Sequence, residues 1–216
     1  MKKIQFLFFS FCLSIFLTAC MGDGNTYALI ETDYGNMKVL LYDDTPKHKE
    51  NFIKLAKEGF FDDLLFHRVI NGFMIQGGDP DSRGASAGQM LGGGGPGYLI
   101  DAEIGSPHFK GSLAAARTGG PSNPEKKSSG SQFYVVQGIP QTDAQLDNME
   151  RYKNIKYTDA QRALYKELGG RPDLDQDYTV FGEVVEGLEI IDEIAKVPTG
   201  ASDRPQQDVK MKISIL

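Results

Sequence analysis

Hydrophobic and polar residues alternate with a period of two in several segments beyond residue 26, which is the pattern of half-buried β-strands. Two apolar-rich runs, 27–32 and 37–41, flank Asp33-Tyr34-Gly35-Asn36, which favours a hairpin because Gly and Asn tolerate positive φ. Near the end of the chain, apolar residues at 209, 211, 213 and 215 alternate with polar ones and predict a strand with one buried face. Further strands are predicted over 64–70, 73–77, 111–116, 133–137 and 179–185.

Two helices are predicted at separated points among these strands. The first has Thr45 as N-cap and Pro46 at its first helical position, carries Phe52 and Ala56 on one face, and ends at Gly59. The second covers 188–195. Many short strands with only two such helices favour a mainly all-β fold, a closed antiparallel β-barrel capped by two α-helices.

Two stretches interrupt the strand pattern. Residues 119–130 form a polar segment rich in Gly, Pro and Ser, which is typical of a loop. Residues 141–170 are polar, with apolar side chains spaced three and then four apart, and predict a helical insertion of one or two short helices that could lie on the barrel as a lid. Because this insertion falls between strands, we expect its deletion to leave a folded, active barrel.

The first 19 residues have the pattern of a secretory signal peptide. Lys2 and Lys3 precede the uncharged run 4–17, whose 14 residues are too few to cross a bilayer core of about 30 Å. Leu17-Thr18-Ala19-Cys20 resembles the lipobox of bacterial lipoproteins, in which the cysteine is lipidated and becomes the new N-terminus. Residues 21–26 include two Gly, an Asp and an Asn and predict a short tether. The alternatives are a plain signal peptide and a buried strand.

Composition and charge narrow the class of protein. The 216-residue chain is 40% hydrophobic and 24% charged, which is typical of globular proteins and excludes collagen, coiled coils and wholesale disorder. Its 25 glycines favour a turn-rich β fold. Loss of Lys2 and Lys3 with the signal peptide leaves 21 basic and 29 acidic residues, so the net charge of −8 argues against nucleic acid as a partner. The processed chain keeps one of the two cysteines, so no internal disulfide is expected.

Two runs of residues carry the candidate chemistry. In the run FHRVINGFMIQGGD, Arg68 lies on a predicted strand, and Asn71-Gly72 forms a turn into the next strand. Alternation in that second strand places Met74 and Gln76 on one face and the odd-numbered Phe73 and Ile75 on the other, unless the turn rotates its start. The second run, GSQFYVV, places Gln132 and aromatic residues at the head of another strand.

Four motifs, FHRVINGFMIQGGD, GSLAAART, GSQFYVV and YTVFGEVVEG, occur in this order and resemble the cyclophilin-type peptidyl-prolyl cis-trans isomerases. The resemblance covers nearly all of 27–216 outside the insertion. It implies an eight-stranded antiparallel barrel closed by two helices, with the substrate, a proline-containing polypeptide, in a groove on its outer face. It also implies catalysis without a nucleophile, metal or cofactor.

The resemblance assigns roles residue by residue. The catalytic residue is Arg68, which would donate a hydrogen bond to the prolyl nitrogen in the twisted transition state. The other site residues are Phe73, Met74, Tyr134 and Leu174 in the proline pocket with Tyr178 at its rim, Gln76 and Gln132 as partners of the substrate backbone, and Ala116 and Arg117 along the groove.

Three positions depart from the most familiar eukaryotic form of the family. Tyr178 stands where those proteins have His, and Arg117 stands where they have Asn; both substitutions resemble bacterial members. Asp173 lies near the position of a Trp, and the chain has no Trp at all. We therefore expect isomerase activity but weak cyclosporin binding.

Other residues with possible chemistry favour structural interpretations. His67 is expected to be structural, because it points to the opposite strand face from Arg68, and Phe133 is assigned to the core. His48 and His108 have no partner at helical i, i+4 spacing, so a zinc site is not expected. The glycine run 92–95 lacks the Lys and Ser/Thr of a phosphate-binding loop and predicts a flexible loop. The acidic pairs at 62–63 and at 101 and 103 are expected to be solvated.

The sequence therefore predicts a signal peptide at 1–19, a lipidated Cys20 with a tether over 20–26, and an isomerase domain at 27–216 that contains the insertion. Its expected function is isomerisation of X-Pro bonds in extracytoplasmic proteins, from a lipid anchor in a bacterial membrane facing the periplasm or the cell surface. The alternative is a module that binds proline-containing segments, as a chaperone or scaffold, with incidental turnover. The pattern predicts no particular oligomeric state.

Overall fold

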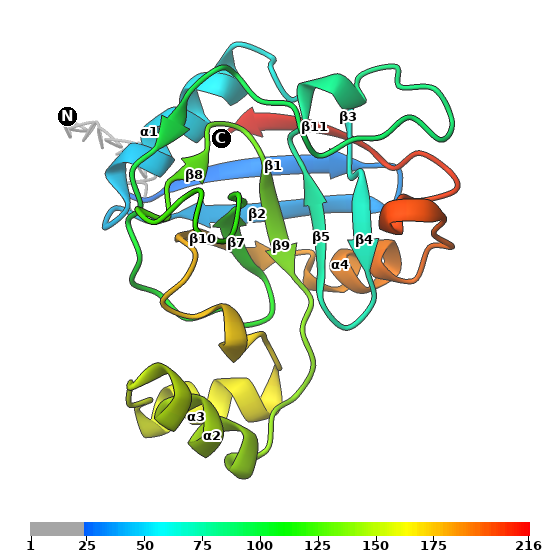
Figure 1. Cartoon of the computed structure of the whole chain (residues 1–216). Helices are drawn as coiled ribbons and strands as arrows, with labels where there is room; N and C mark the ends of the chain where they lie inside the picture. Colours follow the sequence, from blue (N-terminus) through cyan, green and yellow to red (C-terminus); the bar gives the residue numbers. More distant parts are fainter. Residues whose placement is uncertain (1–23) are drawn as a thin grey trace, which may run out of the picture.

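The computed structural model describes residues 24–216 (Figure 1). The predicted signal peptide and Cys20 lie outside the described residues. The helices are α1 (Pro46–Lys57), α2 (Asp143–Lys153), α3 (Asp159–Glu167) and α4 (Leu188–Ala195), with short 3-10 turns η1 (Pro80–Ser82), η2 (Pro172–Leu174) and η3 (Ala201–Asp203). The strands are β1 (Thr26–Thr32), β2 (Gly35–Leu41), β3 (Leu64–Leu65), β4 (Arg68–Ile70), β5 (Met74–Gly77), β6 (Leu99–Ile100), β7 (Ser112–Ala115), β8 (Ser128–Ser129), β9 (Phe133–Val136), β10 (Val180–Glu186) and β11 (Lys210–Ile215).

The main sheet is antiparallel and strongly curled. Within residues 24–216 its nine strands follow the order β3-β11-β1-β2-β10-β7-β9-β5-β4. The two edge strands, β3 and β4, come from one segment that the sequence predicts as a single strand over 64–70. Phe66 and His67 interrupt that strand, so its first part pairs with β11 and its second part pairs with β5. The sheet therefore curls until its two edges meet at this segment, and the predicted β-barrel fold is confirmed with one strand broken.

The core fills the inside of the curled sheet and is closed by α1 and α4, which lie on opposite sides of it (Figure 1). From α1, Phe52 packs against Phe61 and Phe133, with ring centroids 5.1 and 5.7 Å away. Phe133 is therefore a core residue, as predicted. From α4, Ile191 and Ile194 are fully buried in the same cluster. Both predicted helices are confirmed, and α1 ends at Lys57, followed by Glu58 as C-cap and by Gly59, whose φ is positive.

The start of α1 corrects the expectation for Glu103. Thr45 is the N-cap residue, but its side chain makes no cap hydrogen bond. The Glu103 carboxylate instead accepts the backbone N–H groups of Lys47 at 3.1 Å and His48 at 3.0 Å, and it also pairs with His48 Nδ1 at 2.6 Å. Only 13% of the Glu103 side chain is exposed, so Glu103 is a helix cap and not a solvated charge.

Residues 141–170 contain α2 and α3, which lie beyond one end of the sheet (Figure 1). Each helix begins with a capping box, formed by Thr142 with Gln145 and by Thr158 with Gln161. Leu146, Tyr157 and Tyr165 form a separate small core. No helix among residues 24–216 is both long enough and apolar enough to cross a membrane.

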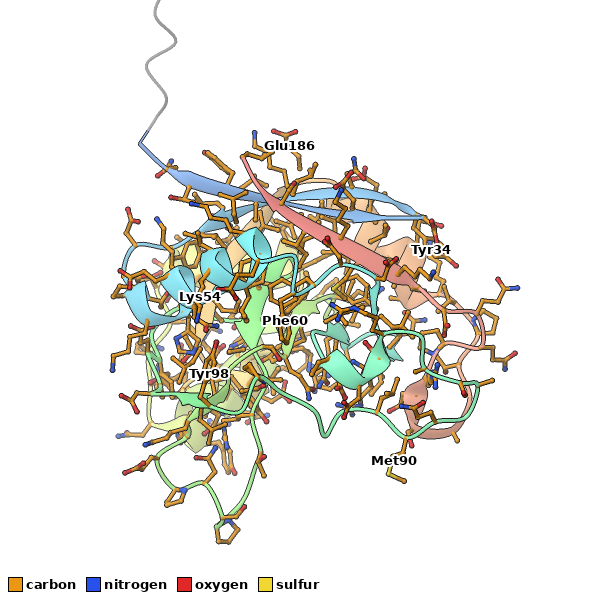
Figure 2. The ribbon with its side chains drawn as sticks, turned by 90° about the horizontal axis from the view of Figure 1, so that it is seen from above. Tyr34, Lys54, Phe60, Met90, Tyr98 and Glu186 are labelled. Atoms are coloured by element: carbon orange, nitrogen blue, oxygen red, sulfur yellow. The ribbon has the colours of Figure 1, made fainter. Side chains whose placement is uncertain are left out.

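Two surface segments project from the barrel. Tyr34 lies at the turn between β1 and β2, and Met90 lies at the outer end of the long loop that leads from η1 to β6 (Figure 2). The Met90 side chain is 88% exposed. The loop between η1 and β6 passes beside the edge of the sheet that carries Arg68, and it contributes to the site described next.

Candidate active site

Arg68 lies on β4, opposite Gln76 on β5. Its side chain is 41% exposed and is held from two sides. Nη1 donates to Gln76 Oε1 at 3.4 Å, and Nε donates to Asp203 Oδ2 at 3.3 Å. Asp203 belongs to η3, 135 residues away in sequence, and no pattern in the sequence points to it. The guanidinium is therefore oriented but still open to a ligand.

Phe73 and Met74 line the same cavity although they are adjacent in sequence. Strand alternation would separate them, but Phe73 lies in the turn before β5, where Gly72 has φ +75°. That turn rotates Phe73 onto the side of Met74, while Ile75 points into the barrel core. The exception allowed in the sequence analysis therefore applies: the turn at Gly72 brings Phe73 to the same side of the sheet as Met74.

Nine of the ten predicted catalytic and substrate-binding residues line one small cavity of about 150 Å³. The tenth, Gln132, lies in the adjoining cavity of about 610 Å³, which shares Gln76, Ala116 and Arg117 with the first. A third cavity, of about 810 Å³, adjoins Arg68 and Gln76 from the other side. The nine residues are Arg68, Phe73, Met74, Gln76, Ala116, Arg117, Tyr134, Leu174 and Tyr178.

The apolar part of the small cavity has its own cluster of side chains, distinct from the barrel core. Met74, Ala114, Tyr134, Val136 and Val180 are buried there, on the outer face of the sheet. Because strand residues alternate between the two faces, β5, β7 and β9 each contribute to the barrel core and to this outer cluster. The sheet itself therefore forms the floor of the cavity.

The two glutamines form a chain of amide hydrogen bonds along the groove. Gln76 Nε2 donates to Gln132 Oε1 at 3.1 Å, and Gln132 Nε2 donates to the carbonyls of Gly92 at 3.0 Å and Gly94 at 2.7 Å. The buried Asp79 accepts the N–H groups of the same two glycines. A Cβ at Gly94 would collide with the Asp79 carboxylate, so glycine is required there. The glycine run predicted as a flexible loop is therefore held in place by hydrogen bonds to Asp79 and Gln132, and it forms one wall of the groove.

Arg117 and Tyr178 form the opposite wall. Arg117 Nε donates to the carbonyl of Asp177 at 2.7 Å, and its guanidinium lies 4.6 Å from the centroid of the Tyr178 ring. Tyr178 in turn meets Tyr134 edge to face, with centroids 5.9 Å apart. Leu174, at the end of η2, completes this side.

Arg171 lies over the ring of Phe73 and is held by Asp173, an arrangement that the sequence did not predict. The Arg171 guanidinium lies 4.0 Å from the centroid of Phe73 and forms two hydrogen bonds to Asp173, at 2.8 and 2.7 Å. Burial opposes ionisation of Asp173, but the bonds from Arg171 outweigh it and lower the pKa of this carboxyl. An ion pair therefore lies beside this end of the cavity, at the segment for which the resemblance implied a missing Trp.

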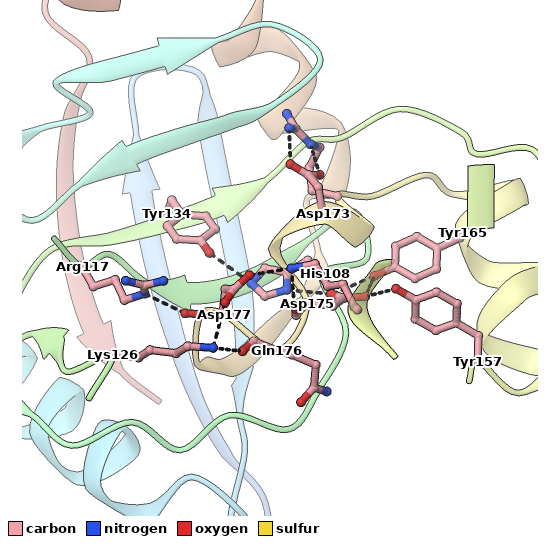
Figure 3. A network of polar contacts seen from close by, with 12 residues as sticks. His108, Arg117, Lys126, Tyr134, Tyr157, Tyr165, Asp173, Asp175, Gln176 and Asp177 are labelled. Atoms are coloured by element: carbon pink, nitrogen blue, oxygen red, sulfur yellow. Dashed lines mark hydrogen bonds and ion pairs between the residues drawn. The ribbon is translucent and has the colours of Figure 1, made fainter. Parts of the chain in front are cut away.

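His108 also has a role that the sequence did not predict. It is fully buried, and its Nε2 lies 3.0 Å from the Tyr134 hydroxyl, while Nδ1 lies 2.9 Å from Asp175 Oδ1 (Figure 3). Burial raises the pKa of Tyr134 well above its usual value, so its hydroxyl stays neutral. These three residues come from three separate segments, and no spacing in the sequence relates them.

His67 is buried as expected, and neither of its ring nitrogens has a hydrogen-bond partner in the described structure. Burial lowers the pKa of His67. Among residues 24–216, no group of three or more His, Cys, Asp or Glu side chains is arranged to hold a metal ion. The groups around the small cavity are two guanidinium groups, an amide, two tyrosines and apolar side chains, which suit the binding of an apolar ring with an adjacent peptide backbone.

Comparisons with known proteins agree with this geometry. The family model described as cyclophilin type peptidyl-prolyl cis-trans isomerase/CLD matches residues 27–214. A Staphylococcus haemolyticus protein named as a peptidyl-prolyl cis-trans isomerase is 35% identical over 188 residues, which cover 87% of this chain and 89% of that protein. A Streptococcus pyogenes protein named as a bifunctional phosphatase/peptidyl-prolyl cis-trans isomerase is 37% identical over 187 residues, but the match spans 83% of this chain and only 36% of that longer protein.

Solved structures show the same similarity. A crystal structure of a cyclophilin type peptidyl-prolyl cis-trans isomerase from Cryptosporidium parvum is 25% identical, has a TM-score of 0.62, and covers 89% of this chain and 98% of that one. A second structure of that protein was determined in the presence of the dipeptide Ala-Pro, and it is 26% identical with a TM-score of 0.61 over 88% of this chain and 98% of that one.

Proposed function

The chain belongs to the cyclophilin-type peptidyl-prolyl cis-trans isomerase family, and we propose that its small outer cavity binds the proline ring while Arg68 catalyses rotation about the X-Pro bond. The observation that carries this proposal is the position of the Arg68 guanidinium at the edge of a cavity lined by Phe73 and Met74. The Ala-Pro dipeptide of the Cryptosporidium parvum structure agrees with a proline-containing substrate.

The reaction needs a donor that acts only in the transition state. Amide resonance sets a barrier of roughly 18–20 kcal/mol for rotation about an X-Pro bond, so the uncatalysed step takes tens to hundreds of seconds. When the bond twists, the prolyl nitrogen regains its lone pair and becomes a hydrogen-bond acceptor. A guanidinium that donates to this nitrogen stabilises the twisted state and leaves the planar ground state unchanged, so it lowers the barrier.

The contacts of Arg68 suit this role. Asp203 binds Nε and Gln76 binds Nη1, and the described residues offer no acceptor to Nη2. The N–H groups of Nη2 are thus available to the prolyl nitrogen. The apolar cavity holds the ring while the carbonyl side of the bond rotates, and Gln76 and Gln132 present amides to the neighbouring peptide backbone.

Catalysis and simple binding are distinguished by comparing rate with affinity. In Arg68→Ala we expect kcat/KM, measured in a protease-coupled assay on a short X-Pro peptide, to fall on the order of 10²–10³-fold. The affinity for the same peptide should change far less, because the apolar cavity remains. Arg68→Lys should also be slow, since an ammonium cannot replace the planar fork that binds Gln76, Asp203 and the prolyl nitrogen together. If Arg68→Ala isomerises as fast as the parent, the mechanism proposed for Arg68 fails; if parent and variant both bind the peptide without isomerising it, the chain is a binding module.

We also propose that the enzyme assists the folding of extracytoplasmic proteins from a lipid anchor on Cys20. The support is the sequence pattern: a positive start, a 14-residue uncharged run and Leu17-Thr18-Ala19-Cys20. More than one acyl chain on this cysteine would be needed for stable anchoring. The substitution Cys20→Ser should abolish labelling by a radioactive fatty acid and release soluble or unprocessed protein from the membrane fraction. Unchanged membrane retention of Cys20→Ser would exclude the anchor and leave the isomerase assignment intact.

A further inference from the structure

We propose that the helical insertion of residues 141–170 positions the proline pocket, because its buried tyrosines hold Asp175 and, through His108, orient Tyr134. This inference rests on the proposed function of the pocket. The sequence predicts a removable insertion that could serve as a lid. In the structure, none of residues 141–170 lines the cavity, so the insertion lies behind the pocket and not over it.

The connection is a continuous series of buried hydrogen bonds (Figure 3). Tyr157 and Tyr165 each donate from the hydroxyl to Asp175 Oδ2 at 2.6 Å. The other oxygen, Asp175 Oδ1, accepts the backbone N–H of His108 at 2.8 Å and faces His108 Nδ1 at 2.9 Å. His108 Nε2 then meets the hydroxyl of Tyr134 at 3.0 Å. Tyr157 precedes α3 and Tyr165 lies within it, so half of these donors to Asp175 come from the insertion.

Because these residues are buried, each hydrogen bond in the series affects the next one. Asp175 is 2% exposed, Tyr165 and His108 are 0% exposed, and Tyr157 is 5% exposed. A carboxylate that is removed from water must be compensated by hydrogen bonds, and losing two of four donors leaves it poorly satisfied. His108 Nδ1 faces Asp175 and its Nε2 faces the Tyr134 hydroxyl, so an Nδ1–H tautomer would present Nε2 as an acceptor to Tyr134. The insertion therefore sets the orientation of a ring that lines the pocket.

A second connection leads from α2 to the opposite wall. Lys153 Nζ donates to the carbonyl of Asp175 at 2.7 Å and to Asp177 Oδ2 at 2.6 Å. Asp177 in turn accepts Arg117 Nε on its own carbonyl at 2.7 Å. Both helices of the insertion are thus bonded to the segment 172–178, which carries Leu174 and Tyr178. On this proposal deletion of 141–170 would disturb the pocket, whereas the sequence alone predicts a folded, active barrel without it.

The test removes hydroxyl groups only. In the double variant Tyr157→Phe with Tyr165→Phe, no cavity forms, but Asp175 loses two donors. We expect kcat/KM to fall about ten-fold. The fall should come from a higher KM and a weaker peptide affinity, with kcat nearly unchanged, because Tyr134 holds the proline ring while Arg68 acts on kcat. A merely destabilised protein would have a smaller active fraction, and so a lower apparent kcat with an unchanged KM.

Three comparisons make the test specific. Tyr152→Phe, in the same insertion but 81% exposed, should match the parent. In a Tyr134→Phe background, the two tyrosine substitutions should change kcat/KM by less than about two-fold further, because the hydrogen-bond series from the insertion then ends at His108. The ¹⁵N shifts of the His108 ring should report an Nδ1–H tautomer in the parent and change in the double variant. Equal losses with and without the Tyr134 hydroxyl, or a loss in kcat alone, would overturn the proposal.

The two proposals fail in distinguishable ways. If Arg68→Ala keeps full isomerase activity, the catalytic mechanism is wrong, but the ¹⁵N shifts and the peptide affinities still decide whether the insertion orients Tyr134. If Arg68→Ala is inactive while the double variant binds peptide as the parent does, the mechanism stands and the positioning role of the insertion is excluded.

Discussion

Asp203 should orient the catalytic guanidinium, and its substitution tests how much of catalysis depends on that orientation. Its carboxylate accepts Arg68 Nε at 3.3 Å, and the two side chains are 46% and 41% exposed. A pair this exposed contributes about 0.2–1 kcal/mol. If all of that energy holds the guanidinium in its productive position, its loss lowers kcat/KM by up to about five-fold, since 1.4 kcal/mol corresponds to ten-fold.

The choice of substitution follows from the backbone. Asp203 has φ +59° and Ser202 has φ +58°, so alanine at either position would add backbone strain. Asp203→Gly accepts this conformation and removes the acceptor, and we expect about a three- to five-fold loss of kcat/KM. Asp203→Asn keeps an acceptor oxygen without the charge, so the expected loss is about two-fold. Ser202→Gly loosens the same turn without touching Arg68 and serves as the matched control.

The decisive measurement is a double-mutant cycle in the protease-coupled assay. In an Arg68→Ala background, Asp203→Gly should leave the residual rate nearly unchanged, because no guanidinium remains to be oriented. The free energy of unfolding in urea should differ from that of the parent by less than about 1 kcal/mol. The reasoning is refuted if Asp203→Gly isomerises as fast as the parent, or if its loss is the same with and without Arg68.

Three further predictions concern the pocket, a helix cap and a buried histidine. Phe73→Ala should weaken peptide binding and lower kcat/KM together, by roughly 5–30-fold, because it removes about 1–2 kcal/mol of apolar contact with the proline ring; a change in kcat alone would contradict this. Glu103→Gln should lower the free energy of unfolding in urea by about 1–3 kcal/mol, since it weakens the cap of α1 and the partner of the buried His48, while Asp101→Asn, at an exposed side chain, should leave this free energy nearly unchanged. Burial lowers the pKa of His67 below its usual 6.5, so the folded protein resists a proton that the unfolded chain takes up, and stability falls as the pH drops below 6.5. In His67→Phe this fall, followed by urea unfolding between pH 7 and 5, should be shallower by up to about 1.4 kcal/mol per pH unit, and equal slopes in the two proteins would exclude the effect.

Local patterns in the sequence determined the elements and much of the pocket. The helix at 46–57 follows from its start and stop residues and its apolar spacing, which act within one or two turns of the chain, and the helix at 188–195 was predicted with the bounds that the structure has. The strands follow from alternation, which reports that one face is buried. The pocket residues follow from the resemblance of four motifs to the cyclophilin-type isomerases, and the structure brings nine of the ten into one cavity.

Where the sequence prediction was incomplete, the missing information was which other segment of the chain a residue or strand contacts. The segment 64–70 is apolar apart from His67 and Arg68, but whether it forms one strand or two depends on β11 and β5, each of which lies second from an opposite edge of the sheet. The side of the sheet on which Phe73 lies depends on the turn before it, not on alternation. Glu103 lies in a polar stretch typical of the surface, yet it caps a helix that begins 57 residues earlier in the chain.

The polar network behind the pocket was decided by tertiary structure alone. Tyr134, His108 and Asp175 are separated by 26 and 67 residues, and Arg68 is separated from Asp203 by 135. A buried polar group must find a hydrogen-bond partner, but its residue type says only that one is needed and not which one. The partner is whichever donor or acceptor the fold places within about 3 Å. Alternation and spacing along the chain indicate which residues are buried. The contacts that orient Arg68 and Tyr134 form only when distant segments pack together.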